Sequence, residues 1–226
     1  SSDTSSPSEA FASAMGAVFA GDNLFMVSGA QVYQSYLSAS ITTKPLGIAW
    51  SSSSAPGLGN KESLWILVDA EPYDKILRVN TDDNSLNTAF DTDGIADAPS
   101  SATEGIAFVT ESNENFLYIV ANDSSGGDQW SPKQKNLYKI KIQDLSVQSG
   151  YPKNLENSGV WDDLGGIAYD GTNLVVVAKQ NQGVWIVDTD GNKISEGWPC
   201  CSSLFGMAGV AVHETRGVMY GANQGK

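Results

Sequence analysis

Gly105-Ile106-Ala107-Phe108 is the clearest copy of a short phrase that recurs along the chain. The other copies are Gly16-Ala17-Val18-Phe19, Gly47-Ile48-Ala49-Trp50, Gly166-Ile167-Ala168-Tyr169 and Gly209-Val210-Ala211-Val212. Five copies in 226 residues correspond to one copy per about 45 residues. A repeat of this length indicates one supersecondary unit per copy, stacked against its neighbours.

Apolar segments of strand length follow each phrase. The second segments are 24–27, 64–68, 116–120, 174–178 and 218–220, and third segments follow in four copies at 31–36, 75–79, 137–142 and 184–187. The second segments are nearly continuous apolar runs, which are typical of strands covered on both faces. In the third segments, Lys139 and Lys141 alternate with apolar residues, as in a half-exposed strand. Each copy therefore predicts an antiparallel meander whose burial decreases from strand to strand.

The segments are separated by turn residues, as at 21–23, 170–173 and 188–192. Convincing amphipathic helix periods are absent, and antiparallel units of three or four strands at this spacing predict an all-β fold, a β-propeller. Glycine and alanine in the innermost strands let backbones approach around a central axis. We expect Trp50, Phe108 and Tyr169 to pack between neighbouring blades.

The number of blades stays open at this point. The last copy contains only two segments, and the first has no clear fourth segment. The five copies could form an incomplete piece of a six- to eight-bladed propeller, or a ring whose missing strands come from elsewhere. We expect a polar leader over 1–10 and a single β-propeller domain over 11–226, with repeats starting near 16, 47, 105, 166 and 209.

The charge balance and the length of the apolar runs argue against a nucleic-acid partner and a membrane-spanning helix. The chain has 13 Lys and Arg against 26 Asp and Glu, a net charge of -13, which argues against a nucleic-acid partner because phosphate backbones reward clustered cations. No apolar run approaches the roughly 20 residues that a membrane-spanning helix needs. We expect a partner surface that is basic or bridged by cations, whose affinity falls as salt rises.

The cysteines and a sequon indicate where the protein works. The only cysteines, Cys200 and Cys201, are adjacent, so they cannot join distant parts of the chain. Free thiols, bonds to another chain and a vicinal disulfide stay open as alternatives. The sequon Asn122-Asp123-Ser124 and the acidic, serine-rich composition favour an extracellular or cell-surface location.

A family resemblance adds to this interpretation. The phrases Thr103-Glu104-Gly105-Ile106-Ala107-Phe108 and Leu164-Gly165-Gly166-Ile167-Ala168-Tyr169 resemble the blade openings of NHL and SMP-30-like propellers, and are most similar to the SdiA-regulated and phytase-esterase-like branch. The resemblance implies that an acidic residue at the position of Glu104 binds a central divalent metal. Leu46, Gly165 and Ala208 stand at the matching positions of other copies and do not complete that metal pattern.

Further candidate residues come from local patterns. The acidic residues Asp91, Asp93 and Asp97 have a spacing at which carboxylates on a tight loop can bind Ca²⁺, although a solvated inter-blade loop is the alternative. His213 is the only histidine, and it is either a general base or a surface residue at a turn.

Two tryptophans complete the set of candidates. Trp130 and Trp198 lie in polar stretches, where exposed aromatic side chains can stack on sugars or protein partners. Together with Glu104, Cys200, Cys201 and His213, they form the predicted set of ligand-binding residues.

Two functions follow from these observations. The first is a secreted or cell-surface propeller that acts as a non-catalytic interaction or structural module, with a protein or glycan partner or with itself. The second is a divalent-metal-dependent hydrolase of the lactonase or phosphoesterase type, with Glu104 at the central channel. No cofactor is implied with certainty, and Ca²⁺ is the cation that the acidic loop would suit.

Overall fold

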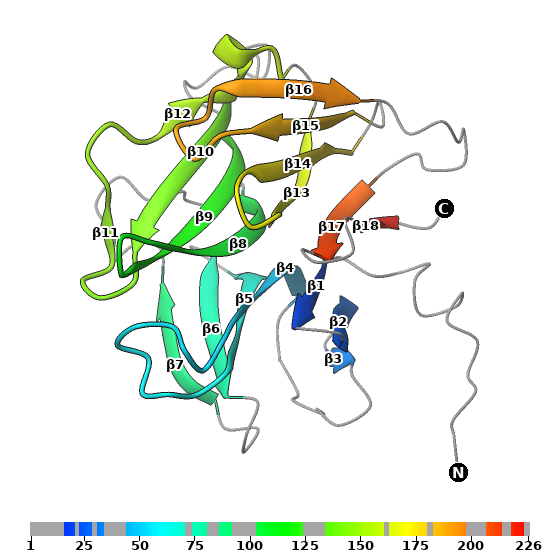
Figure 1. Cartoon of the computed structure of the whole chain (residues 1–226). Coiled ribbons are helices and arrows are strands. Elements are labelled where there is room, and N and C mark those ends of the chain that lie inside the picture. The colour runs from blue at the N-terminus through cyan, green and yellow to red at the C-terminus, as the bar shows by residue number, and fades with distance from the viewer. Residues whose placement is uncertain are drawn as a thin grey trace.

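The chain forms β-sheets throughout the part that the structure describes (Figure 1). The computed structural model describes residues 16–20, 23–28, 31–33, 44–70, 74–80, 86–91, 103–123, 134–160, 163–179, 183–197, 207–213 and 218–223. In these ranges the only helical segment is a short 3-10 helix, Leu155–Ser158. No helix in the same ranges is long and apolar enough to cross a bilayer.

The strands fall into five antiparallel sheets, which we call blades 1 to 5. Blade 1 contains β1 (Gly16–Ala20), β2 (Asn23–Ser28) and β3 (Gln31–Tyr33). Blade 2 contains β4 (Lys44–Ser51), β5 (Ser63–Asp69), β6 (Lys75–Asn80) and β7 (Leu86–Asp91). Blade 3 contains β8 (Thr103–Glu111), β9 (Glu114–Asp123) and β10 (Gln134–Lys141), whose outer side pairs with the short strands β11 (Ser146–Val147) and β12 (Lys153–Asn154). Blade 4 contains β13 (Leu164–Tyr169), β14 (Leu174–Ala178), β15 (Val184–Val187) and β16 (Lys193–Gly197), and blade 5 contains β17 (Met207–His213) and β18 (Val218–Asn223).

The innermost strands of the five blades close into a ring. Around it, β1 contacts β4, β4 contacts β8, β8 contacts β13, β13 contacts β17, and β17 contacts β1. The circle is complete with five strands, so the described innermost strands form a closed ring and not an open arc. What is incomplete is blade 5, which has two strands in the described part of the chain.

Glycine makes this tight ring feasible. A Cβ added to Gly105 would lie 2.8 Å from the Cα of Gly166, and one added to Gly166 would lie 2.8 Å from the Cα of Gly209. The same contact joins Gly47 to Gly105 at 3.1 Å and Gly16 to Gly47 at 3.0 Å. Backbone atoms of neighbouring blades are therefore in contact at the end of the ring where these glycines lie, as the repeated phrase predicted. We call this end the glycine end.

The two residues after each glycine face opposite sides of the blade, because side chains alternate along a strand. Ile106 packs toward blade 2 in the same cluster as Ala49, whereas Ala107 packs toward blade 4 in the same cluster as Ile167. A large residue from one blade thus meets a small residue from the preceding blade. This pairing fills the narrow space between blades near the axis without overpacking it.

The aromatic position of the phrase also packs between blades, as expected. The ring of Phe108 stacks on Trp65 of blade 2, with centroids 6.3 Å apart. The indole nitrogen of Trp65 donates to the hydroxyl of Ser51 at 3.0 Å. Ser51 is a buried residue of β4.

Candidate functional site

A β-bulge stands at the start of four innermost strands. In blades 2 to 5 the strand register shifts just before the ring glycine, and the extra residues are Leu46, Glu104, Gly165 and Ala208. A bulge redirects its side chain out of the ladder. Leu46, Glu104 and Ala208 accordingly line a small cavity of about 10 Å³ at the glycine end, which we call the mouth of the ring. Only Glu104 is charged among its lining residues in the described part of the chain.

The carboxylate of Glu104 is bound by two side chains. Its Oε2 forms an ion pair with the ammonium of Lys179, which follows β14 in blade 4. Its Oε1 accepts a hydrogen bond of 3.0 Å from the amide of Asn122 in β9. The side chains of Glu104 and Lys179 are only 17% and 28% exposed, so the ion pair is shielded from salt more than a surface pair would be.

The carbonyl of Met207 and, less closely, the side chain of Lys179 occupy the space that a side chain at position 165 would need. A Cβ added to Gly165, the bulge residue of blade 4, would lie 1.9 Å from the carbonyl oxygen of Met207 and 3.2 Å from the Cγ of Lys179. Blade 4 therefore has no room for an acidic side chain at the position that matches Glu104. At this position blade 4 instead places the ammonium of Lys179 beside Glu104.

Asn122 links blade 3 to blade 4. Its amide accepts a hydrogen bond from the backbone N–H of Leu164 at 3.0 Å and donates to the carbonyl of Leu164 at 3.1 Å. The residue is only 3% exposed. The sequon was a sign of glycosylation in the sequence, but the folded chain buries this amide, so the sequon no longer supports an extracellular location.

The same end of the ring carries a second polar contact between blades 3 and 4 and one between blades 2 and 3. Lys135 at the start of β10 forms an ion pair of 3.2 Å with Asp163, just before β13. Asp74, which precedes β6 and is 2% exposed, accepts hydrogen bonds from the backbone N–H of Thr103, at 3.2 Å, and from its hydroxyl. Burial raises the pKa of Asp74 above its ordinary value, although the bonds from Thr103 oppose the rise.

The raised pKa of Asp74 yields a testable pH dependence. Over the interval between its unfolded and folded pKa, the folded chain binds more protons than the unfolded chain, so this residue makes the free energy of unfolding fall as pH rises above about 4. Asp74→Asn keeps an acceptor oxygen for Thr103 and removes the titration. We expect the melting temperature of the variant, relative to wild type, to increase between pH 4 and pH 7. A constant difference across this range, measured by thermal denaturation, would contradict the assignment.

The residues at the mouth do not fit a central divalent metal. Among the described residues no three His, Cys, Asp or Glu side chains come together in a way that could hold a metal ion. The bulge positions beside Glu104 carry Leu46, Gly165 and Ala208, which offer no side-chain oxygen ligand. Asp91 is the last residue of β7 and pairs with Lys75 in the ladder, so it belongs to a strand. Asp93 and Asp97 lie outside the described residues.

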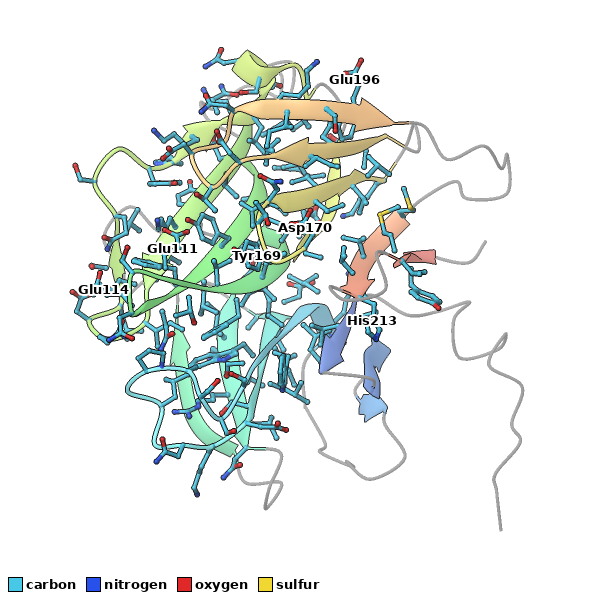
Figure 2. All side chains as sticks on the ribbon, viewed as in Figure 1. Glu111, Glu114, Tyr169, Asp170, Glu196 and His213 are labelled. Carbon is cyan, nitrogen blue, oxygen red and sulfur yellow. The ribbon has the colours of Figure 1, made fainter. Side chains whose placement is uncertain are left out.

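His213, labelled in Figure 2, is the last residue of β17. It pairs with Val218 of β18 in the ladder. Its exposure is 6%. His213 is therefore buried at the end of a strand and is not the surface residue of the alternative interpretation. The other predicted ligand-binding residues, Trp130, Trp198, Cys200 and Cys201, lie outside the described residues.

A second cavity, of about 50 Å³, lies where the phrases end. It is lined by the residues that follow the ring glycines, including Trp50, Phe108, Tyr169 and Val212. Its volume is enough for about one water molecule. Cavities that bind small molecules measure about 300–1,000 Å³. Both cavities are well below that size in the described part of the chain.

Sequence reasoning missed Lys179, Asn122 and Asp74 as parts of this end of the ring. Each is a polar residue at the end of a buried apolar strand, next to the point where a neighbouring blade begins. That position in the sequence was the signal from which these residues could have been predicted. A polar side chain there must find a partner as the blades pack together.

Comparison with known proteins places the fold. No protein-family model matches the sequence, and no curated protein matches it. The solved structures that are similar to this one include the following three. Glutaminyl cyclase of Myxococcus xanthus has a TM-score of 0.61 and 10% identity, over 94% of this chain and 86% of that one. PorZ of Porphyromonas gingivalis, an essential surface component of the type-IX secretion system, has a TM-score of 0.52 and 14% identity, over 93% of this chain and 23% of that one. BBS1N, determined in complex with ARL6DN, has a TM-score of 0.49 and 12% identity, over 81% of this chain and 52% of that one.

At these identities the similarity concerns the fold alone. The chain spans about half of BBS1N and about a quarter of PorZ. Five antiparallel sheets around a closed ring of innermost strands define a β-propeller. The described part of the chain forms five blades of such a propeller.

Proposed function

We propose that this propeller is a non-catalytic interaction module that works outside the cell or at its surface. The observation that carries the proposal is the closed ring itself. Its central cavities measure about 50 Å³ and about 10 Å³, well below the size of a small-molecule site. The ring therefore serves as a rigid hub, and binding falls to the outer surfaces of the blades.

The ion pair at the mouth supports the same proposal. A divalent cation at Glu104 would have to displace the ammonium of Lys179 and the amide of Asn122, both of which bind the carboxylate. It would gain a single carboxylate in return, whereas Ca²⁺ takes six to eight oxygen ligands. The resemblance to SMP-30-like lactonases therefore extends, on our proposal, to the architecture of the blades and not to their metal chemistry.

The location rests on composition and on one structural neighbour. The net charge of -13 keeps an exposed surface soluble, and PorZ is a bacterial surface component with a similar fold. The same charge favours a basic partner. We expect crosslinking with the extracellular fraction of the source organism to recover a partner whose affinity falls as salt is raised from 50 mM to 500 mM. Recovery of the monomer alone, at all concentrations, would overturn the proposal.

The metal-dependent alternative has its own test. Ca²⁺ that binds the folded chain raises its melting temperature by mass action. We expect no such rise in wild type or in Glu104→Gln at millimolar Ca²⁺, and no heat in a calorimetric titration of either protein. Saturable Ca²⁺ binding in wild type that is lost in Glu104→Gln would support the hydrolase and contradict the non-catalytic assignment.

A further inference from the structure

One carboxylate holds a lysine and an asparagine together at the interface between blades 3 and 4. The ammonium of Lys179 binds Oε2 of Glu104, and the amide nitrogen of Asn122 donates to Oε1 at 3.0 Å. The two nitrogens are therefore separated by no more than one carboxylate group and two hydrogen bonds. A primary amine can displace ammonia from a carboxamide when a neighbouring group moves the protons between the two nitrogens.

The fold of the two blades brings these groups together. Glu104 is the bulge residue of β8, and Asn122 lies in the adjacent strand β9. The backbone N–H of Lys179 donates to the carbonyl of Asp163 at 2.7 Å, which fixes the base of the lysine side chain. Glu104 is 18 residues from Asn122 and 75 residues from Lys179 along the chain. An unfolded chain would not hold the three side chains in contact, so folding supplies the proximity that the reaction needs.

The carbonyl of Asn122 is prepared for attack by a nucleophile. Its Oδ1 accepts a hydrogen bond from the backbone N–H of Leu164 at 3.0 Å. Negative charge develops on this oxygen when an amine adds to Cγ, and a backbone N–H that already points at the oxygen stabilises that charge. The amide nitrogen also donates to the carbonyl of Leu164 at 3.1 Å. The orientation of the carboxamide is thus fixed on both sides.

Burial favours the amine over water as the nucleophile. Asn122 is 3% exposed, and exclusion of water suppresses the competing hydrolysis of its side chain to aspartate. The side chain of Lys179 is 28% exposed, which leaves a route for ammonia to reach the solvent. The flexible four-carbon stem of lysine allows its nitrogen to approach Cγ of Asn122.

We propose that Lys179 and Asn122 join in the folded chain as an isopeptide cross-link between blades 3 and 4. Glu104 first accepts a proton from the ammonium, and the neutral amine adds to Cγ while Oδ1 takes up the negative charge. Glu104 then donates its proton to Nδ2, the Cγ–Nδ2 bond breaks as the carbonyl re-forms, and Glu104 accepts a proton from the attacking nitrogen. The products are one secondary amide, one ammonia molecule and a protonated Glu104.

The cross-link goes beyond the proposed function and does not depend on it. Each molecule reacts once with itself, so the reaction uses no external substrate. The new bond would close a covalent loop of the chain between residues 122 and 179. As a disulfide does, it would restrict the unfolded chain and so stabilise the fold.

Intact mass spectrometry of the reduced, folded full chain tests the proposal directly. We expect a mass that is lower than the mass of the sequence by one ammonia molecule. Trypsin cleaves after lysine and arginine but not after an acylated lysine, so it should release a branched peptide in which residues 79–133 are joined to residues 154–193. Folded wild-type protein with the full sequence mass and no branched peptide would overturn the proposal.

Two variants separate the roles of the reacting groups. Lys179→Arg keeps a positive charge beside Glu104 but removes the nucleophile, and it should abolish both the branched peptide and the loss of ammonia. Glu104→Gln keeps an acceptor for Asn122 but cannot carry the protons, so the rate of cross-linking should fall at least about a hundredfold. An equal loss of ammonia in Lys179→Arg would point to ring closure at an asparagine and overturn the assignment.

Lys135→Arg is the matched control. Lys135 pairs opposite Asn122 in the ladder, is 5% exposed, and its ammonium is bound by a different carboxylate, that of Asp163. This variant should form the branched peptide in the same yield as wild type. A cross-link that is lost in folded Lys135→Arg and kept in Lys179→Arg would overturn the assignment to Lys179. Circular dichroism checks that each variant is folded, and the wild-type mass tests the proposal whether or not the variants fold.

Discussion

Gly105→Ala is expected to lower the free energy of unfolding by about 3 kcal/mol. The new Cβ would lie 2.8 Å from the Cα of Gly166 and 2.9 Å from the backbone nitrogen of Ile167. These neighbours are backbone atoms of the next innermost strand, so they cannot move aside by changing a rotamer. The ring would have to widen between blades 3 and 4, and the cluster that fills this interface would lose contacts.

Gly197→Ala is the control for this prediction. Gly197 ends β16, is exposed, and has nothing within 4 Å of an added Cβ. Alanine there should leave stability unchanged or raise it slightly, because it restricts the unfolded chain. Chemical denaturation of both variants measures the difference. Similar stability of the two variants would contradict the close contact of the ring glycines.

Asn122→Ala is expected to cost about 3 kcal/mol, since it removes three hydrogen bonds at a site that is 3% exposed. The N–H and the carbonyl of Leu164 would both lose their partner in a buried place, and each unsatisfied group costs about 1–3 kcal/mol. Glu104 would keep only Lys179. The loss of stability therefore comes from the interface between blades 3 and 4.

The matched control is Asn192→Ala. Asn192 is exposed in the turn between β15 and β16, and its amide donates to Asp188. Removing that bond should cost less than about 1 kcal/mol, because water replaces the partner. Equal losses in the two variants, measured by thermal or chemical unfolding, would show that Asn122 does not join the blades.

The ring could be predicted from the sequence because its requirement is local and repeated. Close approach of backbones admits only glycine at one position, and the repeated phrase carries glycine there in all five copies. The outermost strand of a blade leaves no comparable pattern. Every residue of β16 is exposed, so its strand is fixed by backbone pairing with β15 and not by alternating burial.

The candidate site shows a second limit. Glu104 was found because it belongs to the repeated phrase, whereas its partner Lys179 is 75 residues away in another blade. Asn122 was interpreted as a glycosylation site because three residues alone satisfy that pattern, and burial overrides it. The number of blades depends on the angle at which neighbouring sheets pack, which five copies of a phrase do not specify.

Contact between β1 and β17 has a consequence for how the molecule unfolds. In a linear array of repeats, the terminal units touch one neighbour and loosen first. Here the first and last repeats are neighbours, so every innermost strand contacts two other innermost strands. No repeat of the ring is terminal. Losing any one blade would break two interfaces at once. The five repeats should therefore melt in a single transition rather than peel away one after another.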